Sequence, residues 1–161
     1  MFCSFETNNP FNLNNERSWD NTSNFEFNCG GYAFGTFSWY EPHPDKTERC
    51  DYGFQNAYYR LQKRRWVIKN ILQDFANVRI IHSIKDLHPN EYAVAARMSD
   101  TDFHFMRRDC ADCWSHKRGN HPALWTATDK EVLHSREWIG GYYGKVMLFA
   151  VNRVQSRVSE N

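Results

Sequence analysis

One cysteine and two histidines have the residue types and spacing of a thiol-based catalytic centre. Cys29 follows Asn28 at the expected start of a helix, and His104 and His116 lie in two segments expected to form a β-hairpin. A thiolate is a strong nucleophile, an imidazole can take its proton, and a third polar group can orient the imidazole. The pattern therefore predicts a catalytic set of Cys29 as nucleophile, His104 as base and His116 as orienter.

The residues around Cys29 favour its thiolate form. Asn28 is a good N-cap, so Cys29 would be the first residue of its helix. The unpaired N–H groups and the dipole of a helix start lower a thiol pKa from its ordinary value of about 8.5. The Cys29 N–H is the expected oxyanion donor, with a second donor unassigned. Gly30 and Gly31 would let a ligand approach the backbone, so these glycines and Asn28 are predicted substrate contacts.

The two histidines are expected to lie opposite each other across the hairpin. A turn at residues 109–112 would pair His104 with His116 on one face of the two strands. Directly opposed residues have Cβ atoms about 4.5–5.5 Å apart. One imidazole could therefore position the other.

Each of these residues also has a plainer interpretation. A cysteine in an aromatic-rich helix is more often an inert core thiol, and a histidine in a strand is more often a satisfied polar group. The basic residues near the predicted site are either solvated strand ends or a site for an acidic group of the substrate; they are Arg107, Arg108, Lys117 and Arg118. From this stretch we take Arg107 and Trp114 as candidate substrate contacts.

Two helices and several strands must position the site. A helix is expected over residues 29–39, ended by Pro42 and Pro44, and apolar spacing predicts a second helix over residues 54–75. Alternation and β-branched or aromatic content predict strands at 78–81, 92–98, 101–107, 113–117 and 146–151. This order predicts an α+β domain with N-terminal helices packed on a small antiparallel sheet.

The remaining segments are expected to be less regular. Residues 1–24 are rich in asparagine and are predicted to form an irregular arm. Residues 122–138 are expected to be irregular or partly helical, and the glycines of residues 140–144 predict a flexible linker. We see no boundary between domains, so residues 1–161 are expected to form a single domain.

Composition narrows the class of protein. The chain is 41% hydrophobic and 16% aromatic, which is enough to build a core, and its net charge of +1 gives no basic field that would attract nucleic acid. No apolar run reaches the roughly 20 residues of a membrane span, and the first residues lack the features of a signal peptide. We therefore expect a soluble cytoplasmic protein with no membrane partner. The sequence gives no indication of oligomeric state.

The five cysteines argue against a disulfide framework. Their number is odd and no signal peptide precedes them; they are Cys3, Cys29, Cys50, Cys110 and Cys113. The last two form a C-x-x-C pattern, which suits half of a zinc site, a redox pair or, as we favour, plain turn residues. No metal site and no cofactor is predicted.

The motifs around the three candidate residues resemble those of the papain-like superfamily of thiol hydrolases. Within it, the twelve-residue separation of the histidines resembles the NlpC/P60-like branch of bacterial and phage proteins. The strings that carry the resemblance are Asn28-Cys29-x-x-Tyr32-Ala33, Asp102-Phe103-His104-Phe105-x-Arg107 and Trp114-Ser115-His116-Lys117-x-Gly119. The resemblance covers residues 25–120 and implies a papain-like domain with the Cys29, His104 and His116 triad. Residues 105–107 depart from the small residues usual after the family's catalytic histidine.

The expected function is thiol-dependent hydrolysis of an amide, as a peptidase or amidase, with a peptide, protein or other amide-containing substrate. Two alternatives stay open. The chain could be a non-catalytic binding or inhibitor protein of phage or mobile-element origin on a papain-like frame. The same thiol could also serve an acyltransferase or a deamidase. A Cys29→Ala variant separates occlusion, which would survive it, from catalysis, which would not.

Overall fold

The computed structural model describes six stretches of the chain: 26–36, 38–42, 57–99, 102–119, 123–125 and 127–153. Within them, residues 57–63 and 123–125 are described as backbone. The predicted arm at residues 1–24 lies outside these stretches, as do Cys3, Cys50 and residues 54–56 of the predicted second helix. The described residues form an α+β arrangement, which confirms the fold class predicted from the order of the elements.

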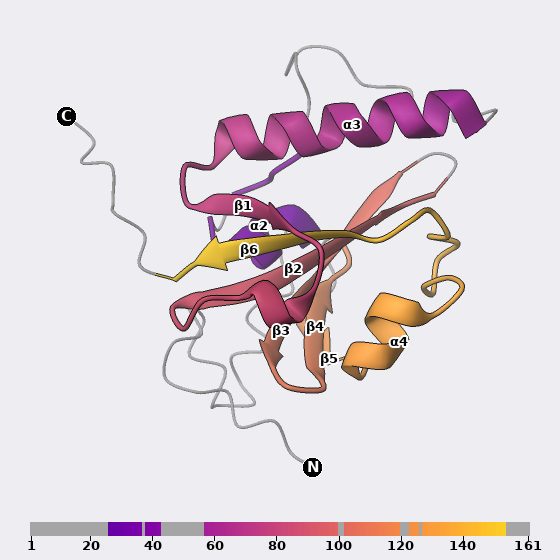
Figure 1. The fold of residues 1–161 in the computed structure, drawn as a ribbon. Coiled ribbons are helices and arrows are strands. Elements are labelled where there is room, and N and C mark those ends of the chain that lie inside the picture. Colours follow the sequence, from indigo (N-terminus) through magenta and orange to yellow (C-terminus); the bar gives the residue numbers. More distant parts are fainter. Residues whose placement is uncertain are drawn as a thin grey trace.

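A fully antiparallel sheet is the centre of the fold (Figure 1). Its strand order is β1-β6-β2-β3-β4-β5, so the last strand in the chain lies between the first and the second. The strands are β1 (Val78–Ile81), β2 (Glu91–Met98), β3 (Phe103–Cys110), β4 (Cys113–Lys117), β5 (Ala123–Trp125) and β6 (Met147–Asn152). Sequence patterns predicted all of these except β5, which falls in a segment expected to be irregular or helical.

The helices lie on both faces of the sheet. They are α2 (Cys29–Phe34), α3 (Ala57–Asp74) and α4 (Asp129–His134). In Figure 1, α3 crosses above the sheet, and α4 lies near the end of the sheet formed by β4 and β5. The first helix is shorter than the predicted 29–39 because Gly35 adopts a left-handed conformation (φ 69°) and its N–H bonds back to the helix carbonyls. Pro42 therefore lies well beyond the helix end.

Alternation along the strands divides the core into two layers. Phe103 and Phe105 of β3 point to the side of α2 and α3, where they join Phe34 and Ile71 in one apolar cluster. Met106, the residue after Phe105, points to the other side, where apolar residues of the α4 segment cover the sheet; these include Val132 and Trp138. The sheet is therefore buried on both faces.

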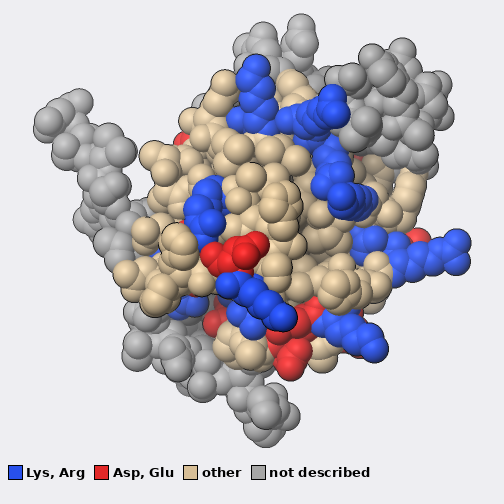
Figure 2. Space-filling view, in the orientation of Figure 1, with Lys and Arg blue, Asp and Glu red and all other residues tan. Residues whose placement is uncertain are grey.

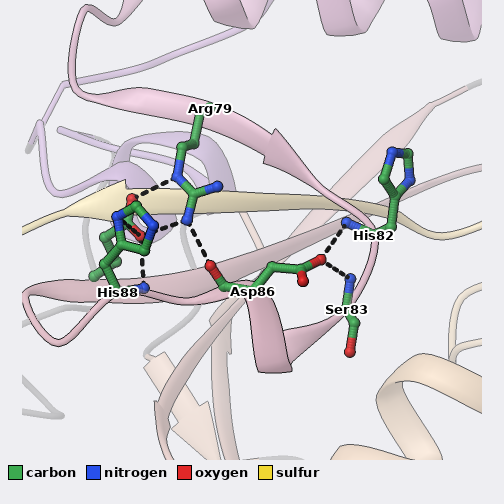
Figure 3. A network of polar contacts seen from close by, with 6 residues as sticks. Arg79, His82, Ser83, Asp86 and His88 are labelled. Atoms are coloured by element: carbon green, nitrogen blue, oxygen red, sulfur yellow. Dashed lines mark hydrogen bonds and ion pairs between the residues drawn. The ribbon is translucent and has the colours of Figure 1, made fainter.

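The connection from β1 to β2 is held by a surface polar network (Figure 3). Arg79 on β1 donates two hydrogen bonds to the Glu91 carboxylate on β2, at 2.9 and 2.7 Å, and one to the Asp86 carbonyl. The Asp86 carboxylate accepts from the backbone N–H groups of His82 and Ser83. These contacts cap the short 3-10 turn at Ile84–Asp86 and fix the start of β2.

The C-x-x-C pair forms a disulfide, contrary to the plain-turn interpretation. Cys110 and Cys113 are register partners at the end of the β3–β4 hairpin, so their side chains start from opposed positions. The turn is the two residues Ala111 and Asp112, with Asp112 at φ 56°, a conformation that aspartate tolerates better than most residues. An odd number of cysteines means only that they cannot all be paired within the chain. It therefore did not exclude a single disulfide between Cys110 and Cys113.

Among the described helices, none is long and apolar enough to cross a bilayer. On the face shown in Figure 2, basic side chains predominate over the upper part, and basic and acidic side chains are interspersed below it.

Candidate active site

Asn28 sets the position of Cys29 by capping α2. Its side-chain oxygen accepts from the Gly31 N–H at 3.1 Å and from the Tyr40 N–H at 3.0 Å, and its amide donates to the Tyr40 carbonyl at 2.8 Å. Cys29 is therefore the first helical residue, as predicted. One side chain thus fixes both the helix start and the segment that folds over it.

The glycines after Cys29 have a different role from the one predicted. A Cβ atom on Gly31 would lie 1.9 Å from the Ser38 carbonyl oxygen, and one on Gly30 would lie 2.8 Å from the Tyr40 carbonyl oxygen. Residues 38–40 of the chain itself, rather than a ligand, occupy the space that the missing side chains leave. The reason for predicting substrate contacts at Gly30 and Gly31 is therefore not supported, because the backbone of the chain itself lies beside these glycines.

The start of α2 contacts the strands where β3 and β4 separate. The β3–β4 register runs from Cys110↔Cys113 to Arg107↔Ser115 and does not continue to Phe105. The Phe105 backbone instead hydrogen-bonds with the Cys29 sulfur. Because α2 contacts both strands, the thiol lies against the backbone beside His104.

The two histidines contact each other although the predicted register was wrong. Continuing the observed register past Arg107↔Ser115 places His116 opposite Met106, two residues from His104. An offset of two residues keeps both side chains on one face, because the side-chain period of a strand is two. His104 Nε2 and His116 Nδ1 lie 2.6 Å apart, with the rings at 77°. The pairing is therefore diagonal rather than direct.

The direction of this hydrogen bond follows from the chemistry required. If His104 takes the thiol proton, its Nδ1 must be the unprotonated nitrogen, since Nε2 faces His116. His104 then donates from Nε2, and His116 accepts at Nδ1. Protonation of His104 preserves that bond, so His116 can orient both states of the base.

A cavity of about 140 Å³ is lined by both Cys29 and His104, whereas His116 is not among its lining residues. The lining residues are Asn28, Cys29, Trp39, Glu41, Asp102, Phe103, His104, Arg118, Gly119 and Tyr142. Trp39, Glu41, Asp102, Arg118 and Tyr142 were not among the predicted site residues. The Asp102 to His104 motif was the sequence signal that could have found one of them.

Tyr142 reaches the site from a segment predicted to be a flexible linker. Its ring lies 5.3 Å from the His104 ring, and its hydroxyl donates to the Asp102 carboxylate at 3.4 Å. The segment is anchored by a β-bridge between Trp138 and Tyr142 and by N–H bonds of residues 143 and 144 to the Met98 carbonyl. Gly140 and Gly141 have positive φ, which allows the tight reversal. The linker prediction was therefore wrong.

Two predicted substrate contacts lie in the interior instead. Trp114 is fully buried, and its indole N–H donates to Asp129 at 2.8 Å. Arg107 is 2% exposed, pairs with Asp109 at 3.2 Å and lies over the Tyr92 ring at 4.6 Å. Neither lines the cavity, so the prediction that they contact substrate is not supported.

Burial holds the site in its neutral state. The pKa of the Cys29 thiol is raised to about 12, mainly by desolvation. Backbone hydrogen bonds from Phe105 and Gly30 oppose this rise in pKa, whereas the charges of Asp102 and Glu41 add to it. The free protein therefore holds a thiol rather than the thiolate expected from the helix start, because desolvation outweighs the helix dipole.

The imidazoles are neutral for the same reason. Desolvation, with smaller contributions from His116 and Arg118, lowers the pKa of His104 to about 3. Desolvation and Arg118 lower the pKa of His116 to about 4. Both rings are thus uncharged at neutral pH, as the donor and acceptor assignment requires.

These histidine pKa values predict that the protein loses stability in mild acid. In the unfolded chain, His104 and His116 would bind protons with pKa values of about 6.5. In the folded protein the two side chains stay neutral until about pH 3 and 4. The contribution of the two histidines to the free energy of unfolding is therefore fully present above pH 6.5. It is lost as the pH falls towards 4, by up to about 1.4 kcal/mol per pH unit for each histidine. Urea unfolding at pH 7.5 and pH 5 measures this loss.

The matched control for this prediction is the double variant His104→Asn, His116→Asn. Asparagine does not titrate in this range, so the variant should lose much less stability than the wild type between the two pH values. Equal losses in the two proteins would assign the acid sensitivity to other groups.

Within the described stretches, no group of three or more His, Cys, Asp or Glu side chains is arranged to hold a metal ion. Cys110 and Cys113, which the sequence allowed as half of a zinc site, are bonded to each other. Comparison of the chain with protein-family models, with curated proteins and with solved structures gave no match. The geometry of the site therefore carries the functional argument.

Proposed function

We propose that the protein is a thiol-dependent amide hydrolase, a peptidase or amidase of papain-like, NlpC/P60-like character. The observation that carries the proposal is that His104, held by His116 at 2.6 Å, lines one small cavity with Cys29 at a helix start. These three residues would supply the nucleophile, the base and the orienting group that acyl transfer needs. A helix bearing the cysteine and an antiparallel sheet bearing both histidines also agree with a papain-like fold.

The reaction begins with transfer of the Cys29 proton to His104 Nδ1. The sulfur attacks the carbonyl carbon of a substrate amide, and the carbonyl electron pair moves to the oxygen, where the Cys29 N–H can donate to it. Collapse breaks the carbon–nitrogen bond, and the leaving amine takes the proton from His104. A water molecule then attacks the thioester and gives a proton to His104, which releases the acid and restores the thiol.

A larger hollow next to the cavity offers room for the rest of a substrate. Its volume is about 430 Å³, and it shares Trp39 and Glu41 with the cavity of Cys29. Trp39 is half exposed at this boundary. A peptide or other extended amide could therefore lie in the hollow while its scissile carbonyl enters the small cavity.

A second candidate function is favoured by the burial of the thiol. Cys29 is 8% exposed and its pKa is raised to about 12, as in an inert core cysteine. A binding protein built on the same frame would have this property. It would bind its partner equally well after Cys29→Ala, whereas a hydrolase would lose turnover.

The test of the proposed function uses p-nitrophenyl acetate, an activated ester that reports acylation without knowledge of the natural substrate. In a Cys3→Ser, Cys50→Ser background, we expect release of nitrophenolate and one acetyl group on Cys29, located by peptide mass spectrometry. The acetyl-thioester should then disappear as water resolves it. Two results together would favour the binding protein. Cys29 would stay unmodified in the folded parent protein, and other residues would be acetylated at the same rate in the Cys29→Ala variant.

A further inference from the structure

Lys117 is a buried cation directly beneath the start of α2. It is the last residue of β4, and its side chain is 0% exposed. Its ammonium donates to the Phe27 carbonyl at 2.7 Å and to the Gly119 carbonyl, and it lies 4.8 Å from the centre of the Phe27 ring. The charge is therefore fixed two residues before Cys29.

The position of Lys117 follows from strand alternation. Ser115 and Lys117 point to the α2 side of the sheet, where Ser115 contacts the Tyr32 hydroxyl at 2.6 Å. His116 points to the opposite side, towards His104. The base system and the ammonium thus approach the start of α2 from different faces of the same strand.

The surroundings of Cys29 make a nearby cation significant. Asp102, before β3, and Glu41, in the segment over α2, both disfavour a thiolate. Tyr142 and the imidazole of His104 also face the cavity, and both are uncharged at neutral pH, while Arg118 contributes a positive charge at its rim. Desolvation lowers the pKa of Lys117, and its electrostatic interaction with Cys29 opposes part of that fall.

We propose that the Lys117 ammonium is the fixed counter-charge of the Cys29 thiolate in the reaction. The inference rests on the proposed function and assigns to Lys117 a positioning role in it. His104 takes the thiol proton, and Lys117 keeps its own proton throughout, so it stabilises the ion pair without joining the transfer. Two carbonyl acceptors hold the ammonium in place whether or not the thiolate is present.

This role separates Lys117 from a solvated strand end, the plainer interpretation of its sequence. A lysine at the surface would extend into water, whereas this one is enclosed and directed at main-chain carbonyls. Burial of an ammonium is costly unless charge or hydrogen bonds compensate it. A thiolate formed on Cys29 adds such compensation when the reaction requires it, because the interaction between the two groups favours the charged lysine.

The test compares the pH dependence of Cys29 alkylation by iodoacetamide in the wild type, Lys117→Gln and Lys117→Arg. Glutamine retains a donor for the carbonyls and removes the charge. Loss of a close opposite charge raises a thiol pKa by about 1–3 pH units. Allowing for the greater nucleophilicity of a more basic thiolate, the rate at pH 8 should fall at least about threefold. Lys117→Arg should restore the rate, and exposed Lys130→Met should leave it unchanged.

A reciprocal measurement does not depend on the folding of the lysine variants. In a Cys29→Asp variant, a carboxylate stands where the thiolate would form, so the pKa of Lys117, followed by NMR, should be higher than in the matched neutral variant Cys29→Asn. The proposal is overturned if Lys117→Gln is folded and alkylates with the wild-type profile, or if Cys29→Asp and Cys29→Asn give the same Lys117 pKa. These outcomes leave the ester assay intact, so failure of this inference is distinguishable from failure of the proposed function.

Discussion

Replacing His104 with alanine is expected to slow acylation of Cys29 by p-nitrophenyl acetate by about 10²–10⁴-fold, the range for loss of a general base. The cause is that Cys29, with a pKa of about 12, is a thiol at neutral pH and has to lose its proton as it attacks. His104 is the neutral imidazole in the cavity that can accept it. Nitrophenolate release at pH 7.5, followed by mass mapping of the acetyl group, measures the effect.

Variants of His116 serve as the control for this result, because His116 acts through His104. His116→Asn retains a side-chain oxygen that can accept from His104 Nε2, whereas His116→Ala does not. We expect the asparagine variant to retain more of the rate than the alanine variant. If His104→Ala acylates within threefold of the wild type, the base assignment is wrong, whatever the behaviour of the His116 variants.

Replacing Phe34 with alanine is expected to destabilise the protein by about 3–5 kcal/mol, the range for removing a buried phenylalanine. Phe34 is 1% exposed, and its ring stacks on that of Phe75 at 4.7 Å and meets Phe105 at 5.3 Å. It also ends the six-residue helix that begins with Cys29. A helix this short has little stability of its own, so packing of this ring holds it on the sheet.

The measurement is the free energy of unfolding in urea at pH 7.5, with Ile139→Ala as the matched control. Ile139 is 81% exposed, so its truncation should change stability by less than about 0.5 kcal/mol. Phe34→Ala should also reduce the acylation rate of Cys29, since the same ring fixes the helix that bears it. A loss of less than 1 kcal/mol would show that the interior rearranges to fill the cavity.

The sequence by itself determined most of the elements, with β5 as the exception among the described strands, and the three candidate residues of the site. Asn28 is an N-cap because its short side chain accepts from the first turn, and this local chemistry can be read directly. Alternation predicted β3 and β4, and the same period put His104 and His116 on one face. Even a register error of two residues preserved that result, because a shift of two does not change the face.

Other features depended on contacts between segments distant in the chain. The last strand, β6, pairs with both β1 and β2, and nothing local to Met147–Asn152 specifies those partners. Tyr142 reaches His104 because backbone N–H groups of its segment bond to the Met98 carbonyl at the end of β2. The glycines that suggested a linker in fact allow a tight reversal, and both uses need the same conformational freedom.

The ionisation state of the site was decided by the tertiary structure, and it reversed the sequence prediction. Position at a helix start predicted a low pKa for Cys29, but α2 and the strands enclose the thiol, and desolvation raises the pKa to about 12. The sequence allowed Lys117 to be a solvated charge at the end of a strand, but the fold buries its ammonium beneath α2. Residue types and spacing thus determined which groups can react. Their protonation depends on the water that folding removes, because desolvation is a property of the whole enclosure and not of any local motif.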